Sequence, residues 1–205
     1  TGVQTCALPI SPLLQAGRAK LYCVESNVSE AWTKKEVPID LRMQRHEAYE
    51  RWVLDRMVPF IRDDCRWSDA PITTAGCSLG ATYAINFALK HPHVFRRAIG
   101  MSGRYLTTEV AGKYSHPTLY FNNPLAYMSN IGGAALDHVR SNTRLTIVCG
   151  RGKWEEGCIE ETIALGELLD RIGVPCETDI WGYESFHDWP WWKRQAMHHF
   201  GRIFA

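Results

Sequence analysis

A serine flanked by glycines is the residue with the clearest chemical potential in this sequence. Gly76-Cys77-Ser78-Leu79-Gly80 follows a short run rich in Ile and Thr, Pro71–Ala75, and opens an apolar helical pattern, Leu79–Leu89. A GxSxG motif between a strand and a helix predicts a tight, strained turn that exposes the serine hydroxyl above the sheet. Glycines two residues to either side leave room for this turn. The motif therefore predicts that Ser78 is a nucleophile for acyl transfer.

A nucleophilic serine needs a base and an acid, which in this arrangement follow in the order serine, acid, histidine on loops after later strands. His187 lies in the loop between the run Thr178–Trp181 and the last helical pattern, and it is the one histidine of eight in that place. The run Leu145–Cys149 leads to two neighbouring glutamates, Glu155 and Glu156. Either could orient the imidazole, and we favour Glu156. The alternative is an acidic pair that only complements the dipole of the following helix.

The sequence gives weaker signals for an oxyanion donor, for the wall of a substrate pocket and for metal ligands. The backbone N–H of Leu79 is expected to donate a hydrogen bond to a developing oxyanion. The candidates for the wall of a substrate pocket are Cys77, Tyr105, Trp154, Trp189, Trp191 and Trp192. For each aromatic residue, packing beneath the last helix is an equally good explanation, and Cys77 fits a small buried residue. His198 and His199 are adjacent on a helix and diverge by about 100°, which makes them a poor pair of metal ligands. No metal or organic cofactor is implied.

Short β-type runs alternate with helical patterns along the chain, which is typical of βαβ units and a parallel sheet. Strands are predicted at Ala19–Val24, Pro71–Ala75, Arg97–Met101, Leu145–Cys149 and Thr178–Trp181. Helices are predicted at Glu47–Ile61, Leu79–Leu89, Ile159–Ile172 and Trp189–Phe204. Between Ser102 and Thr143 the periodicity fails, which predicts loops and short helices of the kind that shape a pocket. We expect one α/β domain, because no repeat or linker divides the chain.

The composition excludes two classes of partner. The chain has 205 residues, 45% hydrophobic, with 23 Lys and Arg against 22 Asp and Glu. This near-zero net charge without a basic run argues against nucleic-acid binding, and no apolar stretch approaches the roughly 18 residues that span a bilayer. Seven cysteines without a CxxC pair match neither a disulfide framework nor a zinc site. Reduced thiols in the cytoplasm are the simplest explanation, and the oligomeric state is open.

The first ten residues look foreign to the protein. Thr1–Ile10 reads TGVQTCALPI, which resembles the translation of a common sequencing adapter. We treat this segment as a scar joined to native residues 11–205 and leave it out of the fold. The natural chain is then expected to extend further upstream, and the sequence carries no information on a signal peptide.

Five motifs distributed over nearly all of the chain after Ile10 point to a known family. They are Tyr22–Ser26 (YCVES), Tyr49–Phe60, Gly76–Gly80, Phe121–Pro124 (FNNP) and His187–Trp192 (HDWPWW). In these motifs the sequence resembles the putative-esterase family of α/β-hydrolases, which includes esterase D and enterochelin-esterase-like proteins, and above all its bacterial cytosolic members. The resemblance implies an α/β-hydrolase fold with a mostly parallel sheet flanked by helices.

The same resemblance implies a serine esterase that hydrolyses small-molecule carboxylic esters. Ser78 would form the acyl-enzyme and His187 would be the base. The acid is usually Asp in this family, so a glutamate here keeps the carboxylate but leaves its position open between Glu156 and Glu155. The alternatives are a thioesterase or acyltransferase on the same triad, or a catalytically silent, hydrolase-like binding fragment.

The resemblance further implies that the first strands of the sheet are absent. The family's eight strands have the spatial order 1-2-4-3-5-6-7-8. If the serine turn follows strand 5, then Ala19–Val24 is strand 4, and strands 1 to 3 would precede the adapter. The second oxyanion donor normally comes from the loop after strand 3, and the loss of one donor costs about 2.7–4 kcal/mol of barrier. We expect Ala19–Val24 either to collapse against Ile72–Ala75 or to remain detached.

Overall fold

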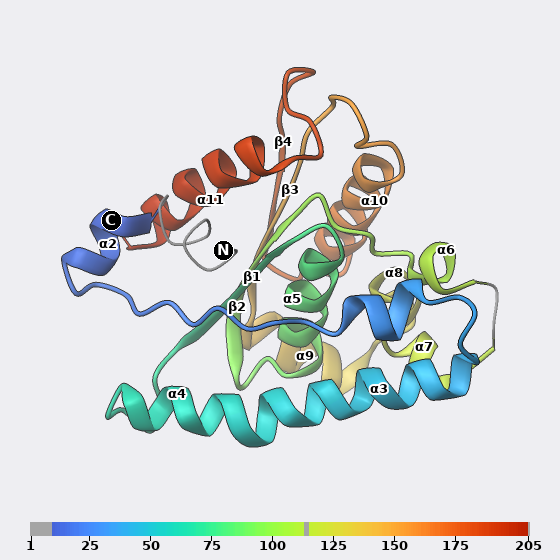
Figure 1. Cartoon of the computed structure of the whole chain (residues 1–205), viewed down its shortest axis with the longest axis horizontal. Coiled ribbons are helices and arrows are strands. Elements are labelled where there is room, and N and C mark those ends of the chain that lie inside the picture. Colours follow the sequence, from blue (N-terminus) through green and yellow to red (C-terminus); the bar gives the residue numbers. More distant parts are fainter. Residues whose placement is uncertain (1–9, 113–114, 205) are drawn as a thin grey trace.

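The fold is built on a parallel sheet, seen in a computed structural model that describes residues 10–112 and 115–204. Residues 1–9 of the suspected adapter segment lie outside this description. Four strands lie in the order β1-β2-β3-β4 (Figure 1). They are β1 (Ile72–Cys77), β2 (Phe95–Met101), β3 (Arg144–Cys149) and β4 (Cys176–Ile180). Four of the five predicted strands are therefore confirmed, and the helix-flanked parallel sheet confirms the predicted α/β class.

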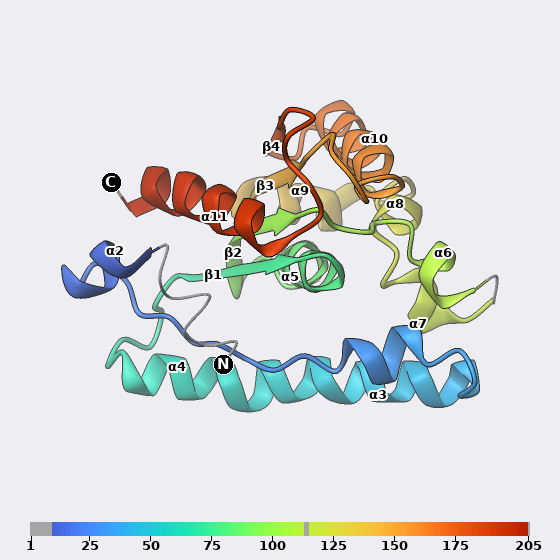
Figure 2. The same ribbon diagram turned by 45° about the horizontal axis from the view of Figure 1, so that its top comes forward.

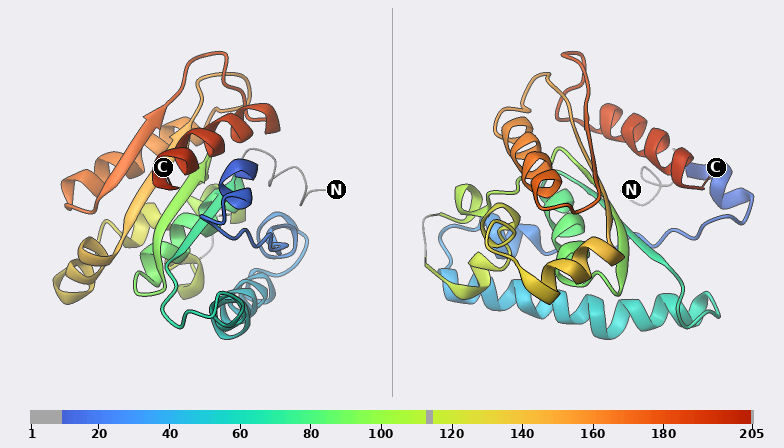
Figure 3. Two further views of the ribbon diagram at one scale, coloured as in Figure 1. Left: turned by 90° about the vertical axis from the view of Figure 1, so that its left-hand side faces the viewer. Right: turned by 180° about the vertical axis from the view of Figure 1, so that it is seen from behind.

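Helices cover both faces of this sheet, with α11 on one face and α5 and α10 on the other (Figures 2 and 3). The helices are α2 (Ser11–Gln15), α3 (Ile39–Trp52), α4 (Val58–Asp64), α5 (Leu79–Lys90), α6 (Thr107–Ala111), α7 (Pro117–Tyr120), α8 (Pro124–Tyr127), α9 (Gly133–Asn142), α10 (Cys158–Arg171) and α11 (Trp189–Phe204), with π-helical turns η2 (Ser29–Thr33) and η3 (Val53–Met57). All four predicted helices are confirmed. The region after Ser102 holds the short helices α6 to α9, as expected. None of the helices in the described residues is long and apolar enough to cross a bilayer.

The two faces of the sheet carry separate cores because side chains alternate along each strand. Ala98, Leu145 and Ile147 belong to the larger core, which includes residues of α3, α5 and α10. Ile99, Met101 and Val148 belong to a smaller core under α11, together with Trp192. The smaller core places the first turns of α11 directly beside the carboxyl ends of the strands.

The first predicted strand is wrong. Ala19–Val24 forms no strand, although its composition is typical of one. The segment is tied to the end of α4 instead, because Lys20 Nζ lies 2.8 Å from the Asp64 carboxylate and the Tyr22 hydroxyl donates to the same group. It therefore remains detached from the sheet, one of the two outcomes expected. Among the described residues β1 has no strand beside its outer edge, so no neighbouring ladder pairs with it there.

The predicted helix Glu47–Ile61 lies within a longer helical stretch formed by α3, η3 and α4, from Ile39 to Asp64. Pro59 has no backbone N–H and would crowd the carbonyl four residues earlier in a regular helix. The π-helical turn η3 directly before it widens the spiral, and the N–H of Val58 bonds the carbonyl of Val53. The chain therefore passes Pro59 without a break, which explains why the helix does not end near it.

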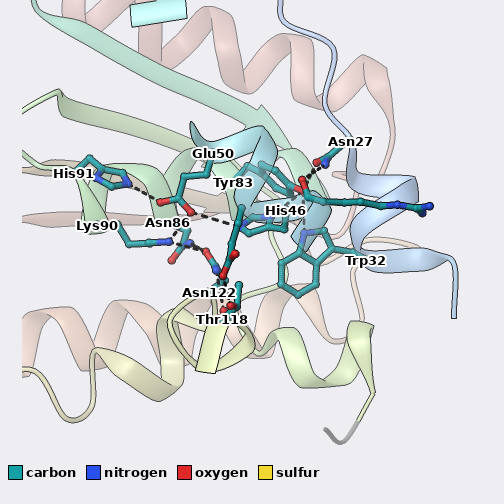
Figure 4. A network of polar contacts seen from close by, with 12 residues as sticks. Asn27, Trp32, His46, Glu50, Tyr83, Asn86, Lys90, His91, Thr118 and Asn122 are labelled. Atoms are coloured by element: carbon teal, nitrogen blue, oxygen red, sulfur yellow. Dashed lines mark hydrogen bonds and ion pairs between the residues drawn. The ribbon is translucent and has the colours of Figure 1, made fainter. Parts of the chain in front are cut away.

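A buried polar network joins α3 to α5 on the larger-core side of the sheet (Figure 4). The Tyr83 hydroxyl donates to Asn27 Oδ1 at 2.8 Å and accepts from Trp32 Nε1 at 2.9 Å. His46 Nδ1 lies 3.1 Å from the same hydroxyl, so this nitrogen must carry the proton that it shares. Burial lowers the pKa of His46 to about 4. The folded protein therefore keeps His46 neutral in ordinary buffers.

Glu50 holds the other end of this network. Its carboxylate lies 2.6 Å from both Lys90 Nζ and His91 Nε2. Burial alone would raise the pKa of Glu50, but the hydrogen bonds from His91 and Lys90 outweigh it and lower the pKa to about 2. Glu50 thus stabilises the fold above pH 4.5, and this contribution is lost as the pH falls through about 2.

His46 is expected to make the fold sensitive to acid in a higher pH window. Between its ordinary pKa of 6.5 and about 4, the unfolded chain binds a proton at His46 and the folded chain does not. The free energy of unfolding should therefore fall by about 3 kcal/mol as the pH drops from 6.5 to 4. Urea unfolding at several pH values in this range measures the slope. In His46→Gln the slope should largely disappear, whereas replacing the exposed His138 by Gln should keep it. Equal slopes in His46→Gln and the wild type would contradict this role.

Candidate active site

Ser78 occupies the turn between β1 and α5, in a backbone conformation that side chains rarely adopt. Its φ is 54° and its ψ is −130°, and its N–H bonds the carbonyl of Met101 at the end of β2 at 2.9 Å. A Cβ on Gly76 would lie 2.2 Å from the carbonyl oxygen of Gly80, so Gly76 is required by this close approach. A Cβ on Gly80 would meet nothing within 4 Å. The expectation that both glycines are needed for space is therefore wrong for Gly80.

The structure brings Ser78, His187 and Glu155 into one hydrogen-bonded line. His187 Nε2 lies 3.0 Å from Ser78 Oγ, and His187 Nδ1 lies 3.0 Å from Glu155 Oε2. The carboxylate can only accept, so Nδ1 donates to it and Nε2 presents a lone pair to the serine hydroxyl. The backbone N–H of His187 bonds the carbonyl of Lys153 at 3.1 Å, which ties the histidine loop to the loop after β3.

Glu155 is the glutamate that lies beside His187, whereas we favoured Glu156 for this place. Glu155 is buried, with 1% of its side chain exposed, whereas Glu156 is exposed. Trp154 has a φ of 67°, so the chain turns through the left-handed region immediately before Glu155. This turn directs Glu155 inward toward the imidazole and leaves Trp154 and Glu156 outside. The preference for Glu156 is therefore corrected, and the alternative residue is the one beside His187.

Ser102 and Trp192 form a second layer behind the Glu155 carboxylate. The Ser102 hydroxyl donates to Glu155 Oε1 at 2.6 Å and accepts from Trp192 Nε1 at 3.0 Å. The Trp192 ring also packs edge-on against the imidazole of His187, with ring centroids 4.9 Å apart. Sequence reasoning missed Ser102 as a site residue. The available signal was its place directly after β2, at the carboxyl edge of a parallel sheet where such sites are built.

The residues expected to wall a pocket divide into three groups. Tyr105 is fully buried in the larger core, so its side chain is a packing residue, which corrects the expectation. Cys77 and Trp192 pack in the smaller core under α11. Trp154 and Trp189 are 60% and 44% exposed, and Trp191 stacks with Arg194. Of the six residues, Trp154 and Trp189 are therefore the ones with large ring surfaces open to solvent.

The N–H of Leu79 belongs to the first turn of α5, where helical N–H groups have no acceptor within their own helix. The positive end of the helix dipole also lies at this turn. Leu79 directly follows Ser78 in the chain. An N–H at this place can donate a hydrogen bond to an oxygen that becomes negative beside Ser78.

Two clusters in the described residues bring atoms that could ligate a metal within 4.8 Å of one another. The first consists of Glu155, Cys158 and His187, and burial raises the pKa of the Cys158 thiol to about 12. The second consists of Asp179, His198 and His199. The ring nitrogens of the two adjacent histidines therefore lie closer together than their divergence on a helix predicted. In this second cluster His199 Nε2 and Trp181 Nε1 already bond the Asp179 carboxylate, at 3.1 and 2.8 Å. It is a satisfied hydrogen-bond network as it stands.

Comparison with known proteins gives one family and a set of related folds. The sequence model of the family described as "Putative esterase" matches residues 25–203. No match was found among curated protein sequences. Among solved structures, a ferulic acid esterase superposes with a TM-score of 0.68 at 18% identity, over 99% of this chain and 79% of its own.

Two hydrolases from Staphylococcus aureus superpose over a smaller part of their length. The S-formylglutathione hydrolase gives a TM-score of 0.60 at 17% identity, over 82% of this chain and 65% of its own. The fluorophosphonate-binding serine hydrolase F gives 0.61 at 18% identity, over 77% of this chain and 64% of its own. The chain thus spans just under two thirds of these two proteins. At such identities the likeness shows the fold, which is that of the α/β-hydrolases.

Proposed function

Because the chain belongs to the "Putative esterase" family, whose model matches residues 25–203, we propose that it hydrolyses carboxylic esters with Ser78, His187 and Glu155 as a catalytic triad. The observation that carries the proposal is the hydrogen-bonded line from Ser78 Oγ through His187 to Glu155, with 3.0 Å at each step. A small-molecule ester is the substrate class. The strained Ser78 backbone supports the nucleophilic role, because strain of this kind concentrates at functional residues.

In the first half of the reaction, Ser78 Oγ attacks the ester carbonyl carbon while its proton passes to His187 Nε2. The carbonyl oxygen becomes negative, and the N–H of Leu79 donates to it. When the tetrahedral intermediate collapses, the imidazolium gives its proton to the departing alkoxide. An alcohol leaves, and the acyl group remains bonded to Ser78.

In the second half, water attacks the acyl carbon and passes its proton to Nε2 of the neutral His187. Collapse of this intermediate returns the proton to Ser78 Oγ and releases the carboxylic acid. Glu155 keeps the proton of His187 on Nδ1 throughout, and its negative charge stabilises the imidazolium that forms twice in the cycle. Its burial strengthens this attraction, because little water competes for the carboxylate.

Hydrolysis of short-chain p-nitrophenyl esters tests the proposed function. The protein should release nitrophenolate in a time course with an initial burst, because acylation precedes slower deacylation. Quenched samples should contain chain that carries one acyl group. A rate no higher than that of the uncatalysed reaction, with no acylated chain over the series of esters, would overturn the proposal.

Ser102 is expected to act as a positioning residue for Glu155. Without its hydroxyl, Glu155 Oε1 and Trp192 Nε1 each lose a hydrogen bond in a buried place. A hydrogen bond to a charged group is worth about 1.5–3 kcal/mol, so kcat should fall by about 10- to 100-fold with little change in KM.

Ser102 has a φ of 53°, a backbone conformation that strains residues other than glycine. Two substitutions separate the effect of losing its hydroxyl from the effect of this strain. Ser102→Ala keeps the strain, whereas Ser102→Gly relieves it, and both remove the hydroxyl. Steady-state kinetics should show the same loss of kcat in both variants. If Ser102→Gly kept wild-type kcat, the hydroxyl would not be needed, and the positioning role would be wrong.

A further inference from the structure

We propose that Glu155, Cys158 and His187 form an inhibitory site for a thiophilic divalent cation such as Zn²⁺. This inference rests on the proposed function, since it assigns a regulator to the same catalytic histidine. The site lies on the Nδ1 side of the imidazole, opposite the side that faces Ser78. Its ligands would be one carboxylate oxygen, one sulfur and one ring nitrogen, a set that Zn²⁺ accepts readily.

The distances between the three donor atoms fit one cation. Glu155 Oε2 and His187 Nδ1 lie 3.0 Å apart, and Cys158 Sγ lies 3.9 Å from His187 Nδ1. All three atoms lie within 4.8 Å of one another. Tetrahedral Zn²⁺ holds nitrogen and oxygen at about 2.0–2.1 Å and sulfur at about 2.3 Å, which places these three ligand atoms roughly 3.3–3.6 Å apart. The two distances to His187 Nδ1 are therefore within a few tenths of an ångström of these values. The third pair, Cys158 Sγ and Glu155 Oε2, lies within 4.8 Å and closes by rotation of the two side chains.

The surroundings of the site favour a cation with affinity for sulfur. Glu155 and Cys158 are 1% and 4% exposed, so their donor atoms are shielded from competing water. A second sulfur, Cys149 Sγ, lies 3.4 Å from Glu155 Oε2 and borders the same place. The His187 side chain is 20% exposed, which leaves a route from solvent to the ring. A carboxylate and a thiolate would together balance the two positive charges of the ion.

Binding would redistribute two protons. The Cys158 thiol loses its proton to solvent as the sulfur bonds the cation. His187 must offer the Nδ1 lone pair, so the proton that Nδ1 carries in the free enzyme moves to Nε2. Nε2 then presents an N–H to Ser78 Oγ instead of a lone pair, and it cannot accept the serine proton. The cation therefore converts the catalytic base into a hydrogen-bond donor and stops acylation.

A zinc titration of ester hydrolysis tests the site. Wild-type activity should fall at least tenfold with Zn²⁺ and return when EDTA is added. Cys158→Ala should need at least tenfold more Zn²⁺ than the wild type to lose the same fraction of its own metal-free activity. Cys176→Ala is the matched control, because this free cysteine is the first residue of β4 and His187 follows the opposite end of that strand. It should behave like the wild type. Equal inhibition of Cys158→Ala and the wild type, or no inhibition of the wild type, would overturn the proposal.

Binding of Co²⁺ to Ser78→Ala separates the metal site from the proposed function. This variant keeps all three proposed ligands and needs no activity for the readout. Co²⁺ bound by a thiolate gives a sulfur-to-metal charge-transfer band in the near ultraviolet, which the Asp179, His198 and His199 cluster cannot give. We expect the band in Ser78→Ala and its loss in the double variant with Cys158→Ala. The band without any esterase activity in the wild type would uphold the site and overturn the proposed function, and no band would overturn the site alone.

Discussion

Ser78→Ala is expected to lower kcat for ester hydrolysis by about 10⁶-fold, because loss of the nucleophile of a serine triad removes most of the catalysis. The variant should fold normally, since alanine keeps the backbone and the Cβ of Ser78. What remains is catalysis by the Leu79 N–H and by substrate binding, which still exceeds the reaction in water. Steady-state hydrolysis of a p-nitrophenyl ester measures the loss.

Ser129→Ala is the matched control for this change. Ser129 is exposed in the turn directly after α8, and its hydroxyl donates to the carbonyl of Leu125. It should keep wild-type kcat and KM. A Ser78→Ala variant that retains more than about a tenth of wild-type kcat would contradict the nucleophilic role, since no acyl-enzyme could form on an alanine.

Glu155→Gln is expected to lower kcat by about 10⁴-fold, the size of effect seen when the acid of a serine triad becomes an amide. The amide nitrogen of glutamine can donate to His187 Nδ1, which places the ring proton on Nε2. Nε2 then points an N–H at Ser78 Oγ and cannot act as base. The loss should lie in kcat, since Glu155 is buried behind the imidazole and away from the substrate.

Glu156→Gln is the matched control for Glu155→Gln. The two glutamates are neighbours in the chain and change in the same way, but Glu156 is exposed and lies outside the hydrogen-bonded line. Its kcat and KM should equal those of the wild type. If Glu156→Gln lost activity and Glu155→Gln did not, the assignment of the acid would be reversed.

The sequence pointed to Ser78 and His187, whose side chains lie 3.0 Å apart in the structure, because their signals are local. Gly76 to Gly80 encodes a turn through short-range geometry, and His187 follows the last strand within a few residues. The choice between Glu155 and Glu156 could not be made in this way. It depends on Trp154, whose φ of 67° is unusual for a residue other than glycine and leaves no mark in composition. Ser102 was missed for a similar reason, because its role arises from side chains that meet across the fold.

The errors in the fold have the same origin. Ala19–Val24 has the composition of a strand, but a strand also needs a neighbouring ladder, and the segment bonds Asp64 instead. Tyr105 follows a strand at the edge where pockets form, yet it fills the space above Gly100 and Gly103, where a Cβ would lie 2.6 and 2.5 Å from its ring or hydroxyl. Local patterns thus predicted most of the helices and strands and the loops that bring Ser78 and His187 together. Tertiary packing decided which other side chains lie beside them.

Labelling with a fluorophosphonate tests the triad most directly, because the reagent reacts with a serine only when a base activates it. We expect mass spectrometry of the digested protein to find one phosphonyl group on the peptide that contains Ser78. The label should be absent from Ser78→Ala and much slower to form in Glu155→Gln than in Glu156→Gln. Absence of label on Ser78 in the folded wild-type protein, or label that persists in Ser78→Ala at the wild-type rate, would contradict a catalytic triad of Ser78, His187 and Glu155.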